Sequence, residues 1–424
     1  MKNTYELKEL ISKSNDKMAD IYGKGNEKMQ IERYLKAVDS FTELYGEKDN
    51  LMIFSAPGRT EICGNHTDHN LGKVVAGSVN LDVIAVVSVD NSDIIEIKSE
   101  GYPVDCISLN DLSVKDEEAN TSSSLIRGVA YRFSELGYKI GGFKAYTTSN
   151  VLKGSGLSSS AAYEVLIGTI LNGAYNDTKV SAVEIAKIAQ FAENVYFKKP
   201  CGLMDQMASS VGGIISIDFA DENNPVVEKI DFDFSSTGYA LCILDTGGNH
   251  ADLTNEYASI PYEMKNVEKY FGKNVLREVK KEEIISNIQP IREKFGDRAV
   301  LRALHFLDEN ENVDNLSQSL KNNDFDTFLK VNKKSGNSSF RFLQNVYANI
   351  NPQEQGISLA IYIAESILKD KGAYRVHGGG FGGTTQNFVP EDMVSEFKEK
   401  AEQVFGKGKC HILNIRKYGG IKVF

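Results

Sequence analysis

Cysteine and long apolar stretches are the features that this sequence has least of. Five cysteines are spread over 424 residues, namely Cys63, Cys106, Cys201, Cys242 and Cys410. Their odd number and wide spacing argue against a disulfide-stapled scaffold and favour reduced thiols. No segment approaches the roughly 18 consecutive apolar residues of a membrane-spanning helix, and residues 1–13 lack the apolar core of a secretory signal. We therefore expect a cytoplasmic protein without a membrane partner.

Positive charge is also in deficit. Lysine and arginine total 48 against 58 aspartate and glutamate residues, which gives a net charge of −10. This balance disfavours a surface built for a polyanion, so nucleic acid is not an expected partner. A local cationic pocket could still hold one phosphorylated ligand. Charged residues at 25% and hydrophobic residues at 41% are ordinary for a globular protein.

The length of the chain predicts more than one domain, because a single hydrophobic core stops growing at roughly 250–300 residues. Apolar residues recur at helical spacing from residue 6 to residue 45, and a polar, turn-rich segment covers 221–225. We predict a helical N-terminal extension at 1–50, a first domain at 51–220 and a second domain at 221–424. Strands are predicted at 51–55, 83–89, 214–219 and 239–244.

A glycine- and serine-rich segment precedes a predicted helix that starts near Ser158. The segment consists of Gly154, Ser155, Gly156, Leu157, Ser158, Ser159 and Ser160. Small residues let backbone N–H groups approach an anion, and the helix behind them adds its positive dipole end, so the pattern predicts a phosphate cradle. It is neither a Walker A loop nor a dinucleotide fingerprint, because no Gly-Lys follows and Ser159 occupies the third glycine position. A serine-rich N-cap on an ordinary helix is the alternative.

A second glycine cluster, Gly378 to Gly383, places five glycines around Phe381. An ordered segment this rich in glycine needs a reason such as tight turns or a close approach to a ligand. A flexible linker is the alternative, but the flanks at 373–376 and 386–389 have the composition of strands.

A polar loop is predicted after the first strand, which we expect to end at Pro57-Gly58. Arg59, His66, Asp68 and His69 bring a fixed cation, two imidazoles and a carboxylate into this short segment, where they can converge on a hydroxylated ligand. A metal site is one alternative, although nothing nearby completes a ligand set. A loop without function is another.

Asp205 is an acidic residue in an otherwise apolar segment, 202–207. Burial raises the pKa of a carboxyl group unless a cation compensates, and Arg59 is a natural partner. An isolated aspartate at such a place is more often a helix cap, which is the alternative.

Taken in chain order, the Arg59 segment, the Gly154 segment and the glycine cluster resemble the three motifs of the GHMP small-molecule kinases. Residues 59–68 resemble the galactokinase branch, and the segments 200–206 and 255–257 support that match. The resemblance covers the chain from about residue 51 onward. It implies an α+β fold of two domains, the first ribosomal-protein-S5-like and the second ferredoxin-like, with the active site between them.

The resemblance also implies an activity and its residues. ATP would phosphorylate the anomeric C1 hydroxyl of a hexose, D-galactose first of all, with Asp205 taking the hydroxyl proton and Arg59 keeping Asp205 ionised. Residues 154–160 would hold the ATP phosphates, and Ser160 with Glu193 would bind Mg²⁺. The implied sugar contacts are Asn65, His66, Asp68, Gly202 and Tyr257. The oligomeric state is open, with a monomer slightly favoured.

Two departures from the family pattern bear on the choice of sugar, whereas Leu152, in place of a usual proline, is expected to matter little. Asn65 stands where the family usually has glutamate, at a position expected to meet the C6 hydroxyl, and His69 stands where tyrosine is usual. An amide tolerates a modified C6 or an acidic sugar better than a carboxylate does. N-acetylgalactosamine, arabinose or a uronic acid is therefore an alternative substrate. A non-catalytic sensor of galactose and ATP, or another GHMP branch, is a further alternative.

Overall fold

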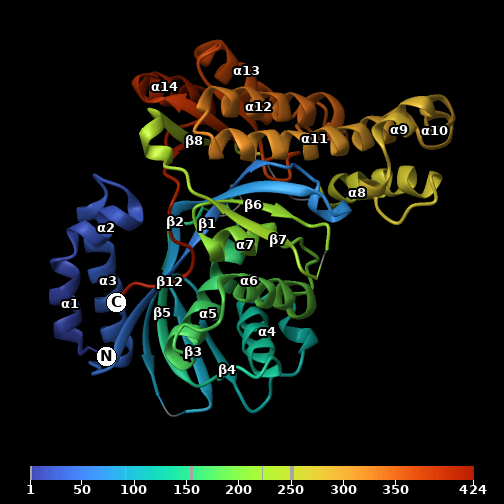
Figure 1. Ribbon diagram of the computed structural model, residues 1–424. Coiled ribbons are helices and arrows are strands. Elements are labelled where there is room, and N and C mark those ends of the chain that lie inside the picture. The colour runs from blue at the N-terminus through green and yellow to red at the C-terminus, as the bar shows by residue number, and fades with distance from the viewer. Residues whose placement is uncertain (1, 91, 153–155, 222, 249–252) are drawn as a thin grey trace.

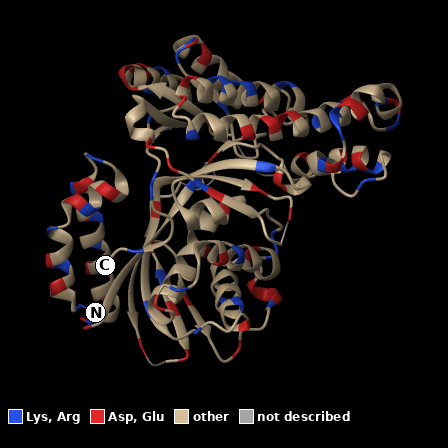
Figure 2. Ribbon diagram, in the orientation of Figure 1, with Lys and Arg blue, Asp and Glu red and all other residues tan. Residues whose placement is uncertain are grey.

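The computed structural model describes residues 2–90, 92–152, 156–221, 223–248 and 253–424. Two β-sheets organise the described chain, and helices cover both of them (Figure 1). Acidic and basic residues are spread over the helices that cover the two sheets (Figure 2). Among the described residues, no helix combines the length and the apolar character that crossing a membrane requires.

The first sheet has eight strands in the order β12-β1-β2-β5-β3-β4, with β6 and β7 continuing from β2. All its pairings are antiparallel except β3 with β5. The strands are β1 (Leu51–Cys63), β2 (Lys73–Val89), β3 (Ile94–Ser99), β4 (Val104–Ser108), β5 (Phe143–Ser149), β6 (Ile214–Asp218), β7 (Val226–Ile230) and β12 (Ile421–Lys422).

Both faces of this sheet are buried, which explains why β1 is apolar at successive positions. Met52 and Phe54 point into the core shared with the central helices, whereas Leu51 and Ile53 pack against the N-terminal helices. The N-terminal helices are α1 (Thr4–Ser12), α2 (Asn15–Tyr22) and α3 (Glu27–Tyr45). The central helices are α4 (Ser122–Glu135), α5 (Ser159–Tyr175), α6 (Ala182–Phe191) and α7 (Met204–Val211).

The second sheet is antiparallel and has the order β11-β8-β10-β9. Its strands are β8 (Tyr239–Asp245), β9 (Ala373–His377), β10 (Thr384–Pro390) and β11 (Cys410–Leu413). Its helices are α8 (Thr254–Tyr270), α9 (Lys281–Ser286), α10 (Ile288–Phe295), α11 (Asp297–Lys321), α12 (Phe325–Ser338), α13 (Gly356–Leu368) and α14 (Val394–Phe405). The glycine cluster therefore connects two paired strands, as its flanks predicted.

Two details differ from the sequence-based expectations. Strand β1 does not end at Pro57-Gly58 but continues to Cys63, with a bulge between Pro57 and Arg59. Arg59 therefore lies in a buried strand and not on a loop. The predicted domain boundary at residue 220 falls between β6 and β7 of one sheet, and β12 brings the last residues back to that sheet. We accordingly propose a boundary near residue 230, with the C-terminal tail added to the first domain.

A buried ion network ties both ends of the described chain to the first sheet. Asp82 of β2 is fully buried and accepts hydrogen bonds from Arg33 of α3 at 2.6 Å and from Arg416 at 2.8 Å. The Tyr22 hydroxyl donates to the same carboxylate at 2.6 Å. Burial raises the pKa of Asp82, but the two guanidinium groups outweigh burial and hold it below its ordinary value. The N-terminal helices are thus anchored by a charge at the centre of the sheet.

Replacing Asp82 with Asn should destabilise the protein by about 3–5 kcal/mol, because Arg33 and Arg416 would remain buried without their counter-charge. Urea unfolding followed by circular dichroism measures the change. The matched control is Asp20→Asn, which alters an exposed acceptor of the Tyr418 hydroxyl and should stay within about 0.5 kcal/mol of the parent. Equal stabilities of the two variants would contradict the anchoring role.

Candidate active site

Arg59 joins two other segments that the sequence singled out. The residue is only 6% exposed. Its Nε and Nη2 atoms donate to the two carboxylate oxygens of Asp205, at 2.6 and 2.7 Å. Its Nη1 donates to the carbonyl of Gly156, and its backbone N–H donates to the carbonyl of Leu157 at 3.0 Å. One guanidinium thus holds the glycine-serine loop and the Asp205 carboxylate side by side.

Asp205 lies in the first turn of α7, and the cap of that helix is Leu203, so the helix-cap interpretation of Asp205 is wrong. Burial by itself raises the pKa of this carboxyl group, but the Arg59 guanidinium outweighs burial and holds the pKa below its ordinary value of 3.8. The side chain keeps 31% of its surface exposed. An ionised carboxylate is therefore accessible to a ligand at neutral pH.

Ser158 precedes α5 but does not cap it with its side chain. Its φ of 55° is left-handed, and no side-chain capping bond forms. The hydroxyl donates instead to Asp205. The interpretation of this segment as an ordinary serine N-cap is thus wrong for Ser158. A serine held in the left-handed region costs on the order of 1–3 kcal/mol, and such strain concentrates at functional sites.

The loop before α5 packs against the end of β9. Gly156 has a φ of 69°, and a Cβ there would lie 3.0 Å from His377 Nδ1 and 3.2 Å from Thr384 Oγ1. Only glycine fits this close approach. Ser159 and Ser160 follow as the first residues of α5. Gly154 and Ser155, the other two residues of the predicted ATP loop, lie outside the described residues.

A pocket of about 740 Å³ opens beside Ser159 and Ser160. Its lining includes the apolar and aromatic residues Val83, Tyr102, Leu125, Tyr163 and Phe197. Residues of β4, β5 and the start of α4 also line it, together with residues of the segments that connect these elements. A pocket with an apolar wall and an end at a helix N-terminus suits a ligand that combines a flat base with phosphate groups.

Carboxylates gather behind Ser160. The Ser160 hydroxyl lies 3.4 Å from Glu193 Oε1, and Lys199 Nζ lies 2.9 Å from the same oxygen. Glu193 belongs to the short π-helical turn η3 (Ala192–Phe197). The amide of Gln206 donates both to Glu193 at 2.7 Å and to Glu164 at 3.1 Å. Burial and the charge of Glu193 raise the pKa of Glu164 well above its ordinary value.

Four of the predicted sugar contacts lie in two places: Gly202 lies beside Asp68, and His66 and Tyr257 contact the glycine cluster. Gly202 packs directly on Asp68, where a Cβ would clash with the carboxylate. His66 Nε2 donates to the carbonyl of Gly379 at 2.9 Å. Burial lowers the pKa of His66 to about 3, so the ring is neutral and its Nδ1 is an acceptor. Tyr257 donates from its hydroxyl to the carbonyl of Gly380 at 2.8 Å.

The metal-site alternative for the His66 segment gains no support. Within the described ranges, no three His, Cys, Asp or Glu side chains gather as ligands for a metal ion. His69 Nδ1 lies 4.0 Å from Asp68 Oδ1, so the two side chains are neighbours without a short contact.

The predicted sugar contact of Asn65 conflicts with its environment. Asn65 is fully buried. Its Nδ2 donates to Glu61 at 2.9 Å and to the carbonyl of Gly378 at 2.8 Å. Its Oδ1 accepts from Asn345 at 2.8 Å and from Ser339 at 3.2 Å. An amide has two donor and two acceptor positions, and all four are occupied by the protein, so this side chain has no hydrogen-bonding capacity left for a sugar hydroxyl.

Several residues of the site were not predicted. Glu164 lies one helical turn after Ser160, and this i, i+4 spacing is a signal that could have placed it on the same face of α5. Gln206 directly follows Asp205 in the segment 202–207. Lys199 and Asn345 carry no local pattern, because only the folded chain brings them to the site.

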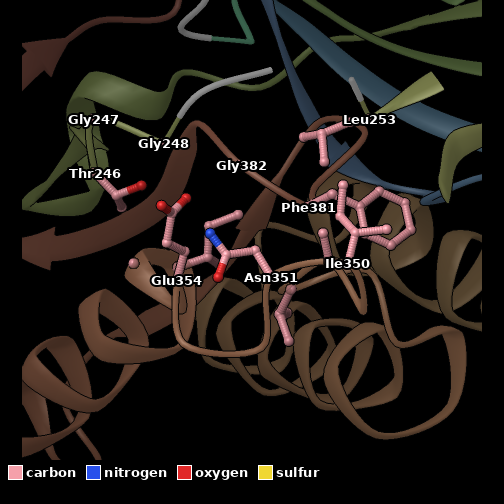
Figure 3. Close-up of a pocket in the computed structure, with 13 residues that line it drawn as sticks. Thr246, Gly247, Gly248, Leu253, Ile350, Asn351, Glu354, Phe381 and Gly382 are labelled. Atoms are coloured by element: carbon pink, nitrogen blue, oxygen red, sulfur yellow. The ribbon is translucent and has the colours of Figure 1, made fainter. Parts of the chain in front are cut away.

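A second cavity, of about 490 Å³, is lined in part by Phe381 and Gly382 of the glycine cluster. Phe381 and Leu253 contribute apolar wall, and the polar side chains of Asn351 and Glu354 stand at the opposite part of the lining (Figure 3). None of the predicted catalytic or sugar-contacting residues lines this cavity. The candidate active site is therefore the space in front of Asp205 and not this pocket.

Replacing Arg59 with Gln should raise the pKa of Asp205 above 3.8, because the buried carboxyl group would lose its cation. In the parent protein the folded pKa lies below the unfolded one, so the pair adds stability above the unfolded pKa and loses it as the pH falls through the folded pKa. In the variant the sign reverses, and ionisation of Asp205 opposes folding as the pH rises. Carbon-13 titration of labelled aspartate, assigned with Asp205→Asn, measures the shift. An unchanged pKa would contradict the coupling.

Comparison with known proteins gives a consistent result. The family model for the GHMP kinase N-terminal domain matches residues 124–213, and the galactokinase galactose-binding signature matches residues 39–89. A galactokinase of Thermotoga petrophila is 32% identical over 358 residues, which cover 84% of this chain and 94% of the relative. A galactokinase of Bacillus subtilis is 28% identical over 374 residues, covering 85% and 90%.

Solved structures agree with the sequence relatives. The Lactococcus lactis galactokinase complexed with galactose superposes with a TM-score of 0.77 at 24% identity, over 92% of this chain and 100% of that chain. A mevalonate kinase gives a TM-score of 0.60 at 16% identity, over 86% and 99%. These likenesses confirm the predicted α+β fold of the GHMP kinases. The identity and coverage of the Thermotoga relative, together with the two matching models, establish that the chain belongs to the galactokinase family.

Proposed function

We propose that this protein is an ATP-dependent galactose 1-kinase, which converts D-galactose and ATP to galactose 1-phosphate and ADP. The observation that carries the proposal is the Arg59 guanidinium, which holds an ionised Asp205 and also binds the loop in front of α5. The proposed base and the proposed phosphate-binding loop are thus held next to each other by one side chain. The names of the curated relatives support galactose as the sugar.

Asp205 accepts the proton of the C1 hydroxyl as that oxygen attacks the γ-phosphorus of ATP. The bond from O1 to phosphorus forms, the bond from phosphorus to the bridging oxygen breaks, and ADP leaves with the electron pair. Phosphoryl transfer depends mostly on positioning and on neutralising charge. Arg59 meets both needs, because it orients Asp205 and adds positive charge beside the transferring group.

The nucleotide occupies the 740 Å³ pocket, with its base against the apolar wall and its phosphates at the N-terminus of α5. Ser160 and Glu193 would hold Mg²⁺, which neutralises phosphate charge when bound. The Ser160 hydroxyl and the Glu193 carboxylate present two oxygens 3.4 Å apart, the donor type that Mg²⁺ prefers. These residues therefore fit the ion. Lys199 Nζ, at 2.9 Å from Glu193 Oε1, places a positive charge beside that carboxylate.

His66, Asp68, Gly202 and Tyr257 form the sugar side of the site. The neutral ring of His66 accepts a hydrogen bond from a sugar hydroxyl through Nδ1, because Nε2 is committed to Gly379. Asp68 accepts from a neighbouring hydroxyl. A site of this kind discriminates strongly, since a sugar that lacks one hydroxyl leaves a buried partner unpaired.

The free thiols, of which Cys106 is exposed, support a reducing cytoplasmic location.

Another sugar is the second candidate substrate, but the contacts of Asn65 disfavour it. The case for a C6-modified or acidic sugar depended on Asn65 meeting the C6 position. The Asn65 side chain is occupied within the protein. His69 remains the departure on the sugar side. The sensor alternative lacks a feature in its favour, because Ser160, Asp205 and Arg59 are all in place.

Purified protein should release ADP in the presence of galactose, and Asp205→Ala should lower kcat by roughly 10²–10⁴-fold, the usual contribution of a general base. A coupled ADP assay over a panel of galactose, N-acetylgalactosamine, arabinose and galacturonic acid measures both effects. Asp177→Ala, at an exposed loop position, is the matched control. Fast turnover of another panel sugar with a negligible rate on galactose would overturn the substrate, and full activity of Asp205→Ala would overturn the base.

Ser160→Ala and Glu193→Gln should each weaken Mg²⁺·ADP binding, because each removes one oxygen donor of the proposed site. Isothermal titration of ADP with and without Mg²⁺ separates the ion from the nucleotide. The variants should lose most of the Mg²⁺-dependent gain in affinity, whereas the control Glu293→Gln, in the exposed part of α10, should keep it. Unchanged gains in both variants would place the ion elsewhere.

A further inference from the structure

Three consecutive carbonyl groups of the glycine cluster are held by side chains from distant parts of the chain. Asn65 donates to the carbonyl of Gly378 at 2.8 Å. His66 and Asn345 donate to the carbonyl of Gly379, at 2.9 and 3.1 Å. Tyr257 donates to the carbonyl of Gly380 at 2.8 Å. The path of this backbone segment is thus set from outside.

Asn345 is the residue that links these contacts. It follows the short π-helical turn η6 (Ser339–Leu343) and is fully buried. One Nδ2 group reaches both Asn65 Oδ1, at 2.8 Å, and the carbonyl of Gly379. Its own backbone carbonyl accepts from the N–H of Phe381 at 2.5 Å. A Cβ at Gly380 would clash with that same carbonyl, so the two segments are in close contact.

Asn65 is fixed equally firmly on the other side. Its backbone N–H donates to Glu309 of α11 at 3.3 Å, and its backbone carbonyl lies 3.0 Å from His305 Nε2. The Gly64 N–H donates to the same glutamate oxygen at 2.9 Å. The backbone of the first turn after β1 is therefore anchored to the second domain, and the Asn65 side chain extends from this anchored backbone to Gly378.

The glycine cluster in turn touches the proposed phosphate loop. A Cβ on Gly378 would lie 3.9 Å from the Cα of Gly156. The residues at either end of the cluster, His377 and Thr384, lie against Gly156 as well. A displacement of the cluster therefore displaces the loop that Arg59 holds beside Asp205.

We propose, on the basis of the proposed kinase function, that the buried amide pair Asn65–Asn345 positions the glycine cluster against the phosphate loop, and that residue 65 does not read the C6 substituent of the sugar. Both are positioning residues. Substitution at position 65 then affects nucleotide binding and kcat, whereas the discrimination between sugars that differ at C6 stays unchanged.

The test compares Asn65→Ala, Asn345→Ala and the double variant with the parent enzyme. Galactose and 6-deoxygalactose are the two substrates, and ADP affinity is measured by isothermal titration. Each single variant should lower kcat by roughly 10–100-fold, as small misplacements near a reacting group do, and should weaken ADP binding. The loss in the double variant should be smaller than the product of the two single losses, because the two residues share the Asn65–Asn345 contact. The ratio of kcat/KM for the two sugars should stay within about twofold of the parent.

The control is Asn172→Ala, which removes a buried amide bonded at 3.0 Å to the N–H and the carbonyl of Val180, near the far end of α5. It should lower the thermal midpoint without weakening ADP binding. A changed sugar ratio in Asn65→Ala, with normal kcat in Asn345→Ala, would overturn the inference. If Asn65→Ala does not fold, the ADP affinity of Asn345→Ala is the test. Normal ADP binding by Asn345→Ala would then overturn the inference, because that is the result expected if residue 65 contacted only the sugar. No turnover of galactose by the parent enzyme would instead count against the proposed function, and the ADP measurements would still test the inference.

Discussion

The guanidinium of Arg59 is the interaction on which the rest of the site depends. Asp205 is buried enough that desolvation alone would favour its neutral form. The bidentate pair at 2.6 and 2.7 Å reverses that preference. The third nitrogen of the same group binds the carbonyl of Gly156. A lysine could not make these three contacts, because it is a point charge without the planar fork.

A buried polar layer carries this arrangement from the first sheet to the second. Glu309 of α11 accepts from Gly64 and Asn65, and Arg375 of β9 donates to Glu61 at 3.2 Å. Burial raises the pKa of Glu61 to about 7, whereas His305 and Arg375 outweigh burial at Glu309 and lower its pKa to about 2. Buried ionic groups add little net stability, but they penalise misalignment strongly. The layer therefore connects α11 and β1, through Asn65, to the glycine cluster that packs on Gly156.

The sequence predicted the features of this site that depend on neighbouring residues, namely the helix after the glycine-serine segment and the strands beside the glycine cluster. The helix behind the glycine-serine segment begins at Ser159, and strands flank the glycine cluster at 373–377 and 384–390. Period and composition carry such features because they depend on neighbouring residues. Arg59 contacts both Asp205 and the carbonyl of Gly156, but its predicted placement on a loop was wrong, because it lies in β1. A proline-glycine pair commonly ends a strand, and only the bulge against β2 lets β1 continue.

Long-range contacts explain what the sequence could not predict. Asn65 is a residue type that often contacts ligands, so the sequence predicted a sugar contact. Its side chain instead bonds to Asn345 and Ser339, which lie more than 270 positions away in the chain. Lys199 and Asn345 reach the site through connections without a pattern. The N-terminal helices showed their periodicity, yet their anchor at Asp82 depends on Arg33 and on Arg416 near the end of the chain.

A crystal structure with galactose and a non-hydrolysable ATP analogue tests the central claim most directly. The account predicts the C1 hydroxyl within about 3 Å of the Asp205 carboxylate, with Arg59 still bonded to both Asp205 and the carbonyl of Gly156. It also predicts the γ-phosphate analogue on the other side of that hydroxyl. A sugar bound with C1 remote from Asp205, or Arg59 turned away from the carboxylate, would contradict it.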